Sequence, residues 1–367
     1  MTPAPNNAKS ARYGRDTQAA RAAQNRAMRL KRKKRKRRRL ILLLILILVL
    51  LGAAITGIIY LFNGRSFDKI VTPYKARNEF SNELAFDDES RLNMFATNLC
   101  VVSGDVPLES ATLEADQTGL LFDLSSNTPM YAKGVYQRIY PASITKIMTA
   151  MLVFEYGNLD EVVTITEEDV NLEEGSQVCG FIPGDSLTLN QLVHCLLVYS
   201  GNDAAAAIAR YIGGSVSGFV DKMNSEAAKL GCTGTHFTNP HGLSDTNHYT
   251  TPYDIYLMLK EALKYPSFTE ITQLSSYTVE YKHQDNSEMK TVLTATDHYL
   301  TGEATPPTGV TILGGKTGTL DMAGNCLALL SQDQYGKPFI SIVMGAKTKD
   351  VLYEQMNSLL QNINQSA

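Results

Sequence analysis

The stretch Pro141-Ala-Ser-Ile-Thr-Lys-Ile-Met-Thr-Ala-Met-Leu-Val-Phe154 decides the fold class, because it carries a structural and a chemical signal together. A proline and a serine stand where helices usually begin, and mostly apolar residues follow them. This pattern predicts a helix that is buried on most sides. Ser143 and Lys146 are three residues apart and therefore share one helical face. A desolvated lysine can lose its charge and then accept the proton of a serine hydroxyl.

Two further short motifs follow along the chain. Ser200-Gly201-Asn202 lies at a break between two predicted helices, where a loop can present a hydroxyl and an amide to a cleft. Lys316-Thr317-Gly318-Thr319 follows a strand-like run. On a strand, Lys316 and Gly318 would face one side and the two threonines the other, and Gly318 would let a substrate backbone approach closely. Taken singly, the three motifs are typical of a helix cap, a turn and an edge strand.

Together and in this order, the three motifs match the SxxK, S-[DG]-N and KTG signature of penicillin-binding proteins and serine β-lactamases. Longer stretches resemble the low-molecular-weight D-alanyl-D-alanine carboxypeptidases, and they are residues 140–150, 199–204, 239–243 and 248–251. The resemblance covers roughly residues 110–360. It implies an α+β, β-lactamase/transpeptidase-like domain in which an antiparallel sheet packs with helices.

The resemblance also implies a role for each motif residue. Ser143 would form the acyl-enzyme, Lys146 would be its general base, and Ser200 would assist proton transfer. The implied substrate-binding residues are Asn202, Lys316, Thr317, Gly318 and Thr319, and the backbone N–H groups of Ser143 and Thr319 would form the oxyanion hole. The substrates would be peptidoglycan stem peptides ending in D-Ala-D-Ala, β-lactam antibiotics would acylate the serine, and neither a cofactor nor a metal is expected.

The chain departs from the better-known members of this family in two respects. Those members have a β-rich second domain and a C-terminal anchor, and neither fits after Met344. They also often place an arginine near the C-terminus to bind the terminal carboxylate, whereas the last arginine here is Arg210. We therefore expect carboxylate recognition by Lys316 and the hydroxyls of its motif, with help from Lys347 or Lys349.

The N-terminal hundred residues predict a membrane anchor. Residues 31–39 are all Lys or Arg, and the uncharged run Leu40–Phe62 follows directly. This run is long enough for a bilayer core of roughly 30 Å, and basic residues usually remain on the cytoplasmic side. We predict a basic cytoplasmic tail over 1–39, a transmembrane helix over 40–62, a stalk over 63–100 and an extracellular or periplasmic peptidase domain over 101–367.

Two other interpretations of the N-terminal region are weaker. A cleaved signal peptide would have a shorter apolar run and a small-residue cleavage site, which Asn63-Gly-Arg65 does not provide. Nucleic-acid binding by the basic tail would favour aromatic residues interleaved with the basic cluster, and residues 31–39 are only Lys and Arg. The predicted partner of this region is therefore the lipid bilayer, through residues 40–62, and not a nucleic acid.

Hydrophobic periodicity predicts helices in the middle of the exported part and strands toward its two ends. Besides the helix after Pro141, helices are expected over Leu189–Val198, Ala204–Ile212 and Val220–Leu230. The expected strands are a hairpin over 120–131 and the runs Val310–Leu313, Cys326–Leu330 and Phe339–Met344. The terminal strands should form one antiparallel sheet. Cys195 and Cys326 lie in apolar runs and should be buried.

Several rival functions remain open from the sequence. A DD-endopeptidase would share the same acyl-enzyme. A class A β-lactamase would add a glutamate after the second motif, but residues 231–241 contain no carboxylate. A zinc peptidase could use His236, His241, Asp245 and His248, although their spacing matches no HExxH-type helix and Pro240 and Gly242 indicate a loop. A catalytically silent scaffold would have no need for the intact motif residues.

Overall fold

The computed structural model describes residues 102–111 and 113–365. The predicted tail, membrane helix and stalk, and Cys100, lie outside the described residues. Within the described part, no helix is both long and apolar enough to cross a membrane. The α+β prediction is confirmed there, because helices pack against antiparallel sheets.

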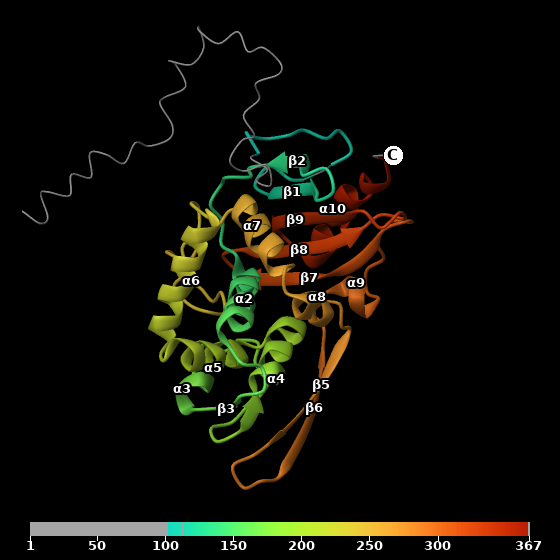
Figure 1. The fold of residues 1–367 in the computed structure, drawn as a ribbon. Helices are drawn as coiled ribbons and strands as arrows, with labels where there is room; N and C mark the ends of the chain where they lie inside the picture. The colour runs from blue at the N-terminus through green and yellow to red at the C-terminus, as the bar shows by residue number, and fades with distance from the viewer. Residues whose placement is uncertain (1–101, 112, 366–367) are drawn as a thin grey trace, which may run out of the picture. The chain divides into compact units, whose positions relative to one another are not determined.

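The main sheet joins strands from the two ends of the described chain (Figure 1). Its order is β2-β1-β9-β8-β7, and every neighbouring pair is antiparallel. The strands are β1 (Thr118–Asp123), β2 (Thr128–Lys133), β7 (Thr311–Leu320), β8 (Gly324–Gln332) and β9 (Pro338–Ala346). The predicted terminal sheet and its hairpin are therefore confirmed. Strand β8 is buried along nearly its whole length, which explains its continuous apolar run.

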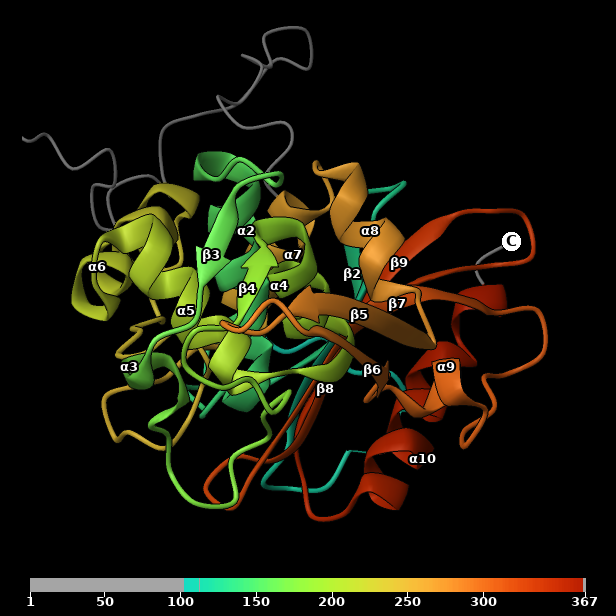
Figure 2. The ribbon, with the colours of Figure 1, turned by 90° about the horizontal axis from the view of Figure 1, so that it is seen from below.

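Helices cover both faces of this sheet (Figure 2). On one face, α10 (Lys349–Leu360) packs Leu352, Met356 and Leu359 into an apolar cluster with the sheet. On the other face lie α2 (Lys146–Tyr156), α7 (Pro252–Ala262) and α8 (Pro266–Thr272). A larger apolar cluster joins these helices to the sheet and to the helical part of the molecule.

The middle of the chain forms a helical region with a second, four-stranded sheet. Its order is β3-β4-β5-β6, and its strands are β3 (Val162–Thr164), β4 (Ser186–Thr188), β5 (Ser276–Lys282) and β6 (Glu288–Thr294). The helices here are α3 (Glu167–Val170), α4 (Leu189–His194), the π-helix η3 (Cys195–Tyr199), α5 (Asn202–Gly213) and α6 (Val216–Leu230). The short elements η2 (Ala142–Thr145), α9 (His298–Thr301) and η4 (Ile363–Gln365) complete the described structure.

Each helix and strand that the periodicity predicts is present, with shifted ends. The helix expected over Leu189–Val198 is α4 followed by η3, and the strand expected at Val310–Leu313 continues through the third motif. Cys195 and Cys326 are fully buried as expected, and the four cysteines in the described chain carry free thiols. The second sheet was not predicted, since its strands are short or polar on one face. Helix α10 was not predicted either.

Candidate active site

Ser143 and Lys146 lie where a short helix passes into a long one. Ser143 belongs to the 3-10 helix η2, and Lys146 is the first residue of α2. The Lys146 side chain is fully buried, while Ser143 is only partly buried and faces a cavity. The Lys146 Nζ donates to the Ser143 Oγ at 2.8 Å. It also donates to the Asn202 Oδ1 at 2.7 Å and to the His241 backbone oxygen at 2.9 Å.

The surroundings of Lys146 disfavour its positive charge. Burial lowers the pKa of its ammonium well below the ordinary value, and the nearby charge of Lys316 lowers it further. Cys179 and Asp203 act in the opposite direction and do not outweigh these effects. The lowered pKa favours the neutral amine, which is the form of Lys146 that can take the proton of the serine hydroxyl it contacts.

The backbone around Ser143 is held tightly by two glycines. Ala142 has a positive φ of 47°, which is rare for a residue with a side chain. Gly242 packs against it so closely that a Cβ there would lie 1.8 Å from the Ala142 oxygen. A Cβ on Gly318 would lie 2.9 Å from the Pro141 oxygen and 3.1 Å from the Ser143 nitrogen. The backbone that closely approaches Gly318 thus belongs to η2 itself, whereas the sequence had suggested substrate.

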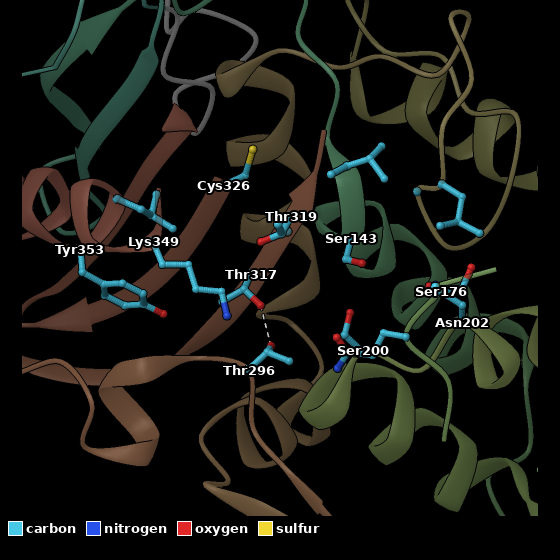
Figure 3. A pocket seen from close by; sticks show the side chains of 17 residues that line it. Ser143, Ser176, Ser200, Asn202, Thr296, Thr317, Thr319, Cys326, Lys349 and Tyr353 are labelled. Carbon is cyan, nitrogen blue, oxygen red and sulfur yellow. Dashed lines mark hydrogen bonds between the residues drawn. The ribbon is translucent and has the colours of Figure 1, made fainter. Parts of the chain in front are cut away.

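The second motif lies directly across from Ser143. The π-helix η3 ends at Ser200, whose φ of 68° and ψ of 32° place it in the left-handed region. This turn lets Asn202 begin α5 and direct its Oδ1 to Lys146. Ser200 and Asn202 both line the cavity (Figure 3). The predicted break between two helices is therefore present, and it brings this motif to the cavity that Ser143 lines.

A loop that the sequence did not single out forms another wall of the cavity. Ser176 and Gln177 of this loop line the cavity. The buried Asp203 carboxylate accepts the backbone N–H groups of Cys179 and Gly180, each at 3.0 Å. The Asn202 N–H donates to the Gln177 oxygen at 2.8 Å. Asn202 and its neighbour Asp203 therefore also fix this loop.

The third motif lies on strand β7 and alternates as predicted. Lys316 and Gly318 are buried, whereas Thr317 and Thr319 are more accessible and line the cavity. The Thr317 Oγ1 lies 2.5 Å from the Thr296 Oγ1, a contact drawn in Figure 3. The Thr319 hydroxyl donates to the Asn325 Oδ1 at 3.1 Å.

Lys316 stands behind the cavity wall with little hydrogen bonding. Its Nζ donates to the Thr317 backbone oxygen at 3.0 Å. Burial lowers the pKa of this ammonium to about 7, and Asp297 opposes that shift. Lys316 can therefore gain or lose its proton near neutral pH. The groups around it thus determine whether the cavity has a positive charge behind its wall.

All three motifs meet at one cavity of about 320 Å³. Ser143, Ser200, Asn202, Thr317, Gly318 and Thr319 line it, and the two buried lysines stand directly behind them. Figure 3 shows Ser143 on one side of the cavity and the β7 threonines on another.

The two lysines proposed as replacements for an arginine differ in position. Lys349, at the start of α10, is exposed and lines the cavity. Lys347 instead pairs with Glu114 at 2.6 Å and is not part of the cavity lining. The structure therefore selects Lys349 as the cation that a bound ligand can reach.

The histidines that suggested a zinc site lie in the loop over 236–248, where His248 makes structural hydrogen bonds. In the described chain, no three His, Cys, Asp or Glu side chains are grouped so that they could hold a metal ion. The buried His248 Nε2 lies 2.8 Å from the Thr145 Oγ1, and its Nδ1 accepts the Thr238 N–H at 3.1 Å. Burial lowers the pKa of His248 to about 4, so it is neutral at pH 7. It ties the 238–248 loop to η2, behind Ser143.

Comparison with known proteins agrees with the geometry. Residues 106–348 match the family described as D-alanyl-D-alanine carboxypeptidase. The chain is 34% identical over 251 residues to the D-alanyl-D-alanine carboxypeptidase DacF of Bacillus subtilis, covering 66% of this chain and 61% of that protein. It is 28% identical over 263 residues to DacC of Escherichia coli, covering 69% and 62%. The chain thus spans about three fifths of the length of these relatives.

A solved structure supports the same assignment. The crystal structure of the Streptomyces K15 DD-transpeptidase superposes with a TM-score of 0.64 and 27% identity, covering 71% of this chain and 98% of that one. Because the family match covers well over half of this chain and includes all three motifs, the chain belongs to the D-alanyl-D-alanine carboxypeptidase family.

Proposed function

We propose that this chain is a serine D-Ala-D-Ala carboxypeptidase that removes the terminal D-Ala of peptidoglycan stem peptides through an acyl-enzyme on Ser143. The observation that carries the proposal is the 2.8 Å contact between the Lys146 Nζ and the Ser143 Oγ. That lysine is desolvated and its pKa is lowered, so it can act as a base at neutral pH.

The first half of the reaction forms an ester. As the Ser143 Oγ bonds to the carbonyl carbon of the penultimate D-Ala, its proton passes to the neutral Lys146. The carbonyl oxygen becomes an oxyanion, for which the N–H groups of Ser143 and Thr319 are the proposed donors. The tetrahedral centre then collapses, the peptide C–N bond breaks, and the leaving amine of D-Ala takes the proton held by Lys146, which becomes neutral again. Ser200 and Asn202 border this path and are the proposed proton-relay and substrate-placing groups.

The second half hydrolyses the ester. Lys146, neutral again, takes a proton from the attacking water, and the same oxyanion site stabilises the second tetrahedral centre. The ester C–O bond breaks, and the Ser143 oxygen recovers the proton from Lys146. A β-lactam presents a strained amide to the same serine, so it should acylate Ser143 and remain attached if water attacks that ester slowly. Both steps require only groups that already surround the cavity.

Recognition of the substrate carboxylate is assigned to the β7 side of the cavity. The Thr317 and Thr319 hydroxyls face the cavity, and Lys316 supplies positive charge from behind. Lys349 adds an accessible ammonium on the same wall, and Figure 3 shows its side chain extending toward Thr317. A terminal carboxylate bound there would leave the penultimate carbonyl for Ser143. A substrate without a free carboxylate should therefore bind poorly.

The test compares the full chain with Ser143→Ala. We expect the natural chain to release D-Ala from a muropeptide pentapeptide and to become labelled by a fluorescent penicillin. The alanine variant should do neither, while Ser217→Ala, on the exposed surface of α6, should do both. Persistence of both activities in Ser143→Ala would refute the proposal. Cleavage of a cross-linked dimer in place of the pentapeptide would indicate an endopeptidase, and rapid nitrocefin turnover a β-lactamase.

We also propose, from the sequence, that the run Leu40–Phe62 anchors this activity to the outer face of the cell membrane. The support is its uncharged composition beside the basic block 31–39. The full chain should then stay with membranes during alkaline carbonate extraction, and deletion of 40–62 should release an active protein. Extraction of the undeleted chain would contradict this proposal and leave the proposed chemistry untouched.

A further inference from the structure

A buried carboxylate lies next to the β7 side of the cavity, outside the three motifs. Asp297 caps the N-terminus of α9, and its side chain is 5% exposed. The preceding residue, Thr296, joins this segment to β7 through the 2.5 Å contact with Thr317. Asp297 is therefore fixed beside the strand that carries Lys316.

The hydrogen bonds of this carboxylate are incomplete. The Asp297 Oδ1 accepts the Tyr299 N–H at 3.0 Å and the Tyr353 hydroxyl at 3.2 Å. Its Oδ2 is buried and accepts no hydrogen bond from the described residues. Tyr353 itself lines the cavity from α10. A buried negative charge with one unpaired oxygen is costly unless a cation nearby offsets it.

The complementary cation is Lys316. It is 1% exposed, and the single acceptor of its Nζ in the described chain is the Thr317 backbone oxygen. The two side chains form no direct salt bridge there, so they act on each other through a low-dielectric interior. Charges in such an interior interact far more strongly than charges in water.

We propose that Asp297 is a positioning residue that holds Lys316 in its charged form, and so sets how tightly the site binds the substrate carboxylate. This inference rests on the proposed carboxypeptidase function. Asp297 would not touch the substrate. It would act through the strand, and its effect would appear in substrate binding more than in the chemical step.

The other titratable groups around the pair have separate roles. Asp297 is faced by His298 and Tyr299 from its own segment and by Tyr353 from α10. Lys316 is faced by Lys146 from α2, whose positive form would repel it. Burial raises the pKa of Asp297, and these hydrogen bonds and the charges of His298 and Lys316 oppose that rise. Lys349 lies farther out, at the exposed rim of the cavity.

These charges determine the direction in which the pKa of Lys316 changes when Asp297 is replaced. Burial lowers the pKa of Lys316 to about 7, and the Asp297 charge raises it. Removing that charge must lower this pKa further, so Lys316 becomes neutral at a lower pH. The acidic limb of kcat/KM should report Lys146, which must be neutral, and the alkaline limb Lys316, which must be charged.

The experiment is the pH profile of kcat and KM for Asp297→Asn in the full chain, with a pentapeptide substrate. Asparagine is nearly isosteric and is also a good helix cap, so α9 should be retained. We expect the alkaline limb of kcat/KM to move down by about one pH unit, which corresponds to about a tenfold loss at alkaline pH. The loss should lie mainly in KM, should shrink to about twofold at pH 6, and should nearly vanish at pH 5.

The matched control is Glu303→Gln, which removes an exposed carboxylate beside His298 on the same segment. Its limb should stay in place, because an exposed charge is screened by water. If Asp297→Asn does not fold, Asp297→Ser provides another neutral cap and is measured in the same way. An alkaline limb that does not move, one that moves up, or an equal loss at every pH would overturn the inference. Failure of the natural chain to release D-Ala would instead reject the proposed function.

Discussion

Two buried lysines flank the cavity, and they differ in what surrounds them. Lys146 contacts the serine hydroxyl, an amide oxygen and a backbone oxygen, and it is repelled by the other lysine. Lys316 has one backbone acceptor in the described chain and a buried carboxylate nearby. Burial lowers the pKa of both ammonium groups; the charge of Lys316 lowers that of Lys146 further, whereas the charge of Asp297 opposes the lowering for Lys316. One residue type thus supplies both the proposed base and the proposed anion-binding charge.

The first test of this comparison removes the proposed base. In Lys146→Met, we expect kcat to fall by about 10³-fold, because general-base catalysis contributes about 10²–10⁴-fold. Penicillin labelling should slow in parallel, since it needs the same proton transfer. Stopped assays of D-Ala release and labelling rates measure both. Lys264→Met, an exposed lysine paired with Glu261, is the control and should match the natural chain. Labelling at the natural rate in Lys146→Met would show that another group activates the serine.

The second test removes the proposed cation. Lys316→Met should reduce kcat/KM by about 10²-fold, which corresponds to the loss of one charge-assisted contact of about 3 kcal/mol. Most of the loss should appear in KM. A loss confined to kcat would assign Lys316 to the chemical step and remove the distinction between the two lysines.

Lys316→Met should also change the thermal stability of the protein. The folded-state pKa of Lys316 is about 7, below the ordinary 10.5, so the unfolded chain binds more protons between these values. This shift lowers the free energy of unfolding by its full amount below pH 7, and by less as the pH rises toward 10.5. Lys316→Met should therefore melt at a higher temperature than the natural chain at pH 7, and the gap should narrow by pH 10. Calorimetry at both pH values checks this, and a constant gap would contradict the assigned shift.

The smallest expected effect concerns the rim of the cavity. Lys349→Ala should raise KM for the pentapeptide about fivefold with little change in kcat, because an exposed ion pair contributes about 1 kcal/mol. High salt should reduce the difference. Lys347→Ala, which breaks only the contact with Glu114, is the matched control and should leave KM unchanged. Equal effects of the two variants would mean that the rim charge acts on the substrate only at long range.

The sequence could predict the parts of this site that lie within one local pattern. The apolar helix around Lys146, the break at Ser200 and the alternation on β7 each follow from a few adjacent residues, and the structure confirms these placements. Gly242 and Gly318 pack closely against η2 although they are far from it in the sequence. No local sequence pattern could predict these contacts.

The carboxylates that support the site were also hard to predict, because they contact it through segments that are distant in the sequence. Asp203 looks like an ordinary helix residue, yet its carboxylate fixes the loop at Cys179 and Gly180. Asp297 looks like a helix cap, and only the contact of Thr296 with Thr317 reveals its neighbour on β7. The second sheet was missed because β3 and β4 are only three residues long. Such features arise from tertiary packing, which periodicity does not report.

The central claim is that Ser143 is the residue that carries the acyl group. The most direct measurement is to react the full chain with penicillin, quench it, digest it and locate the added mass by tandem mass spectrometry. We predict one penicilloyl group per chain, on the Ser143 hydroxyl, and none in Ser143→Ala. An adduct on Ser200, or on any other residue with Ser143 unmodified, would contradict it.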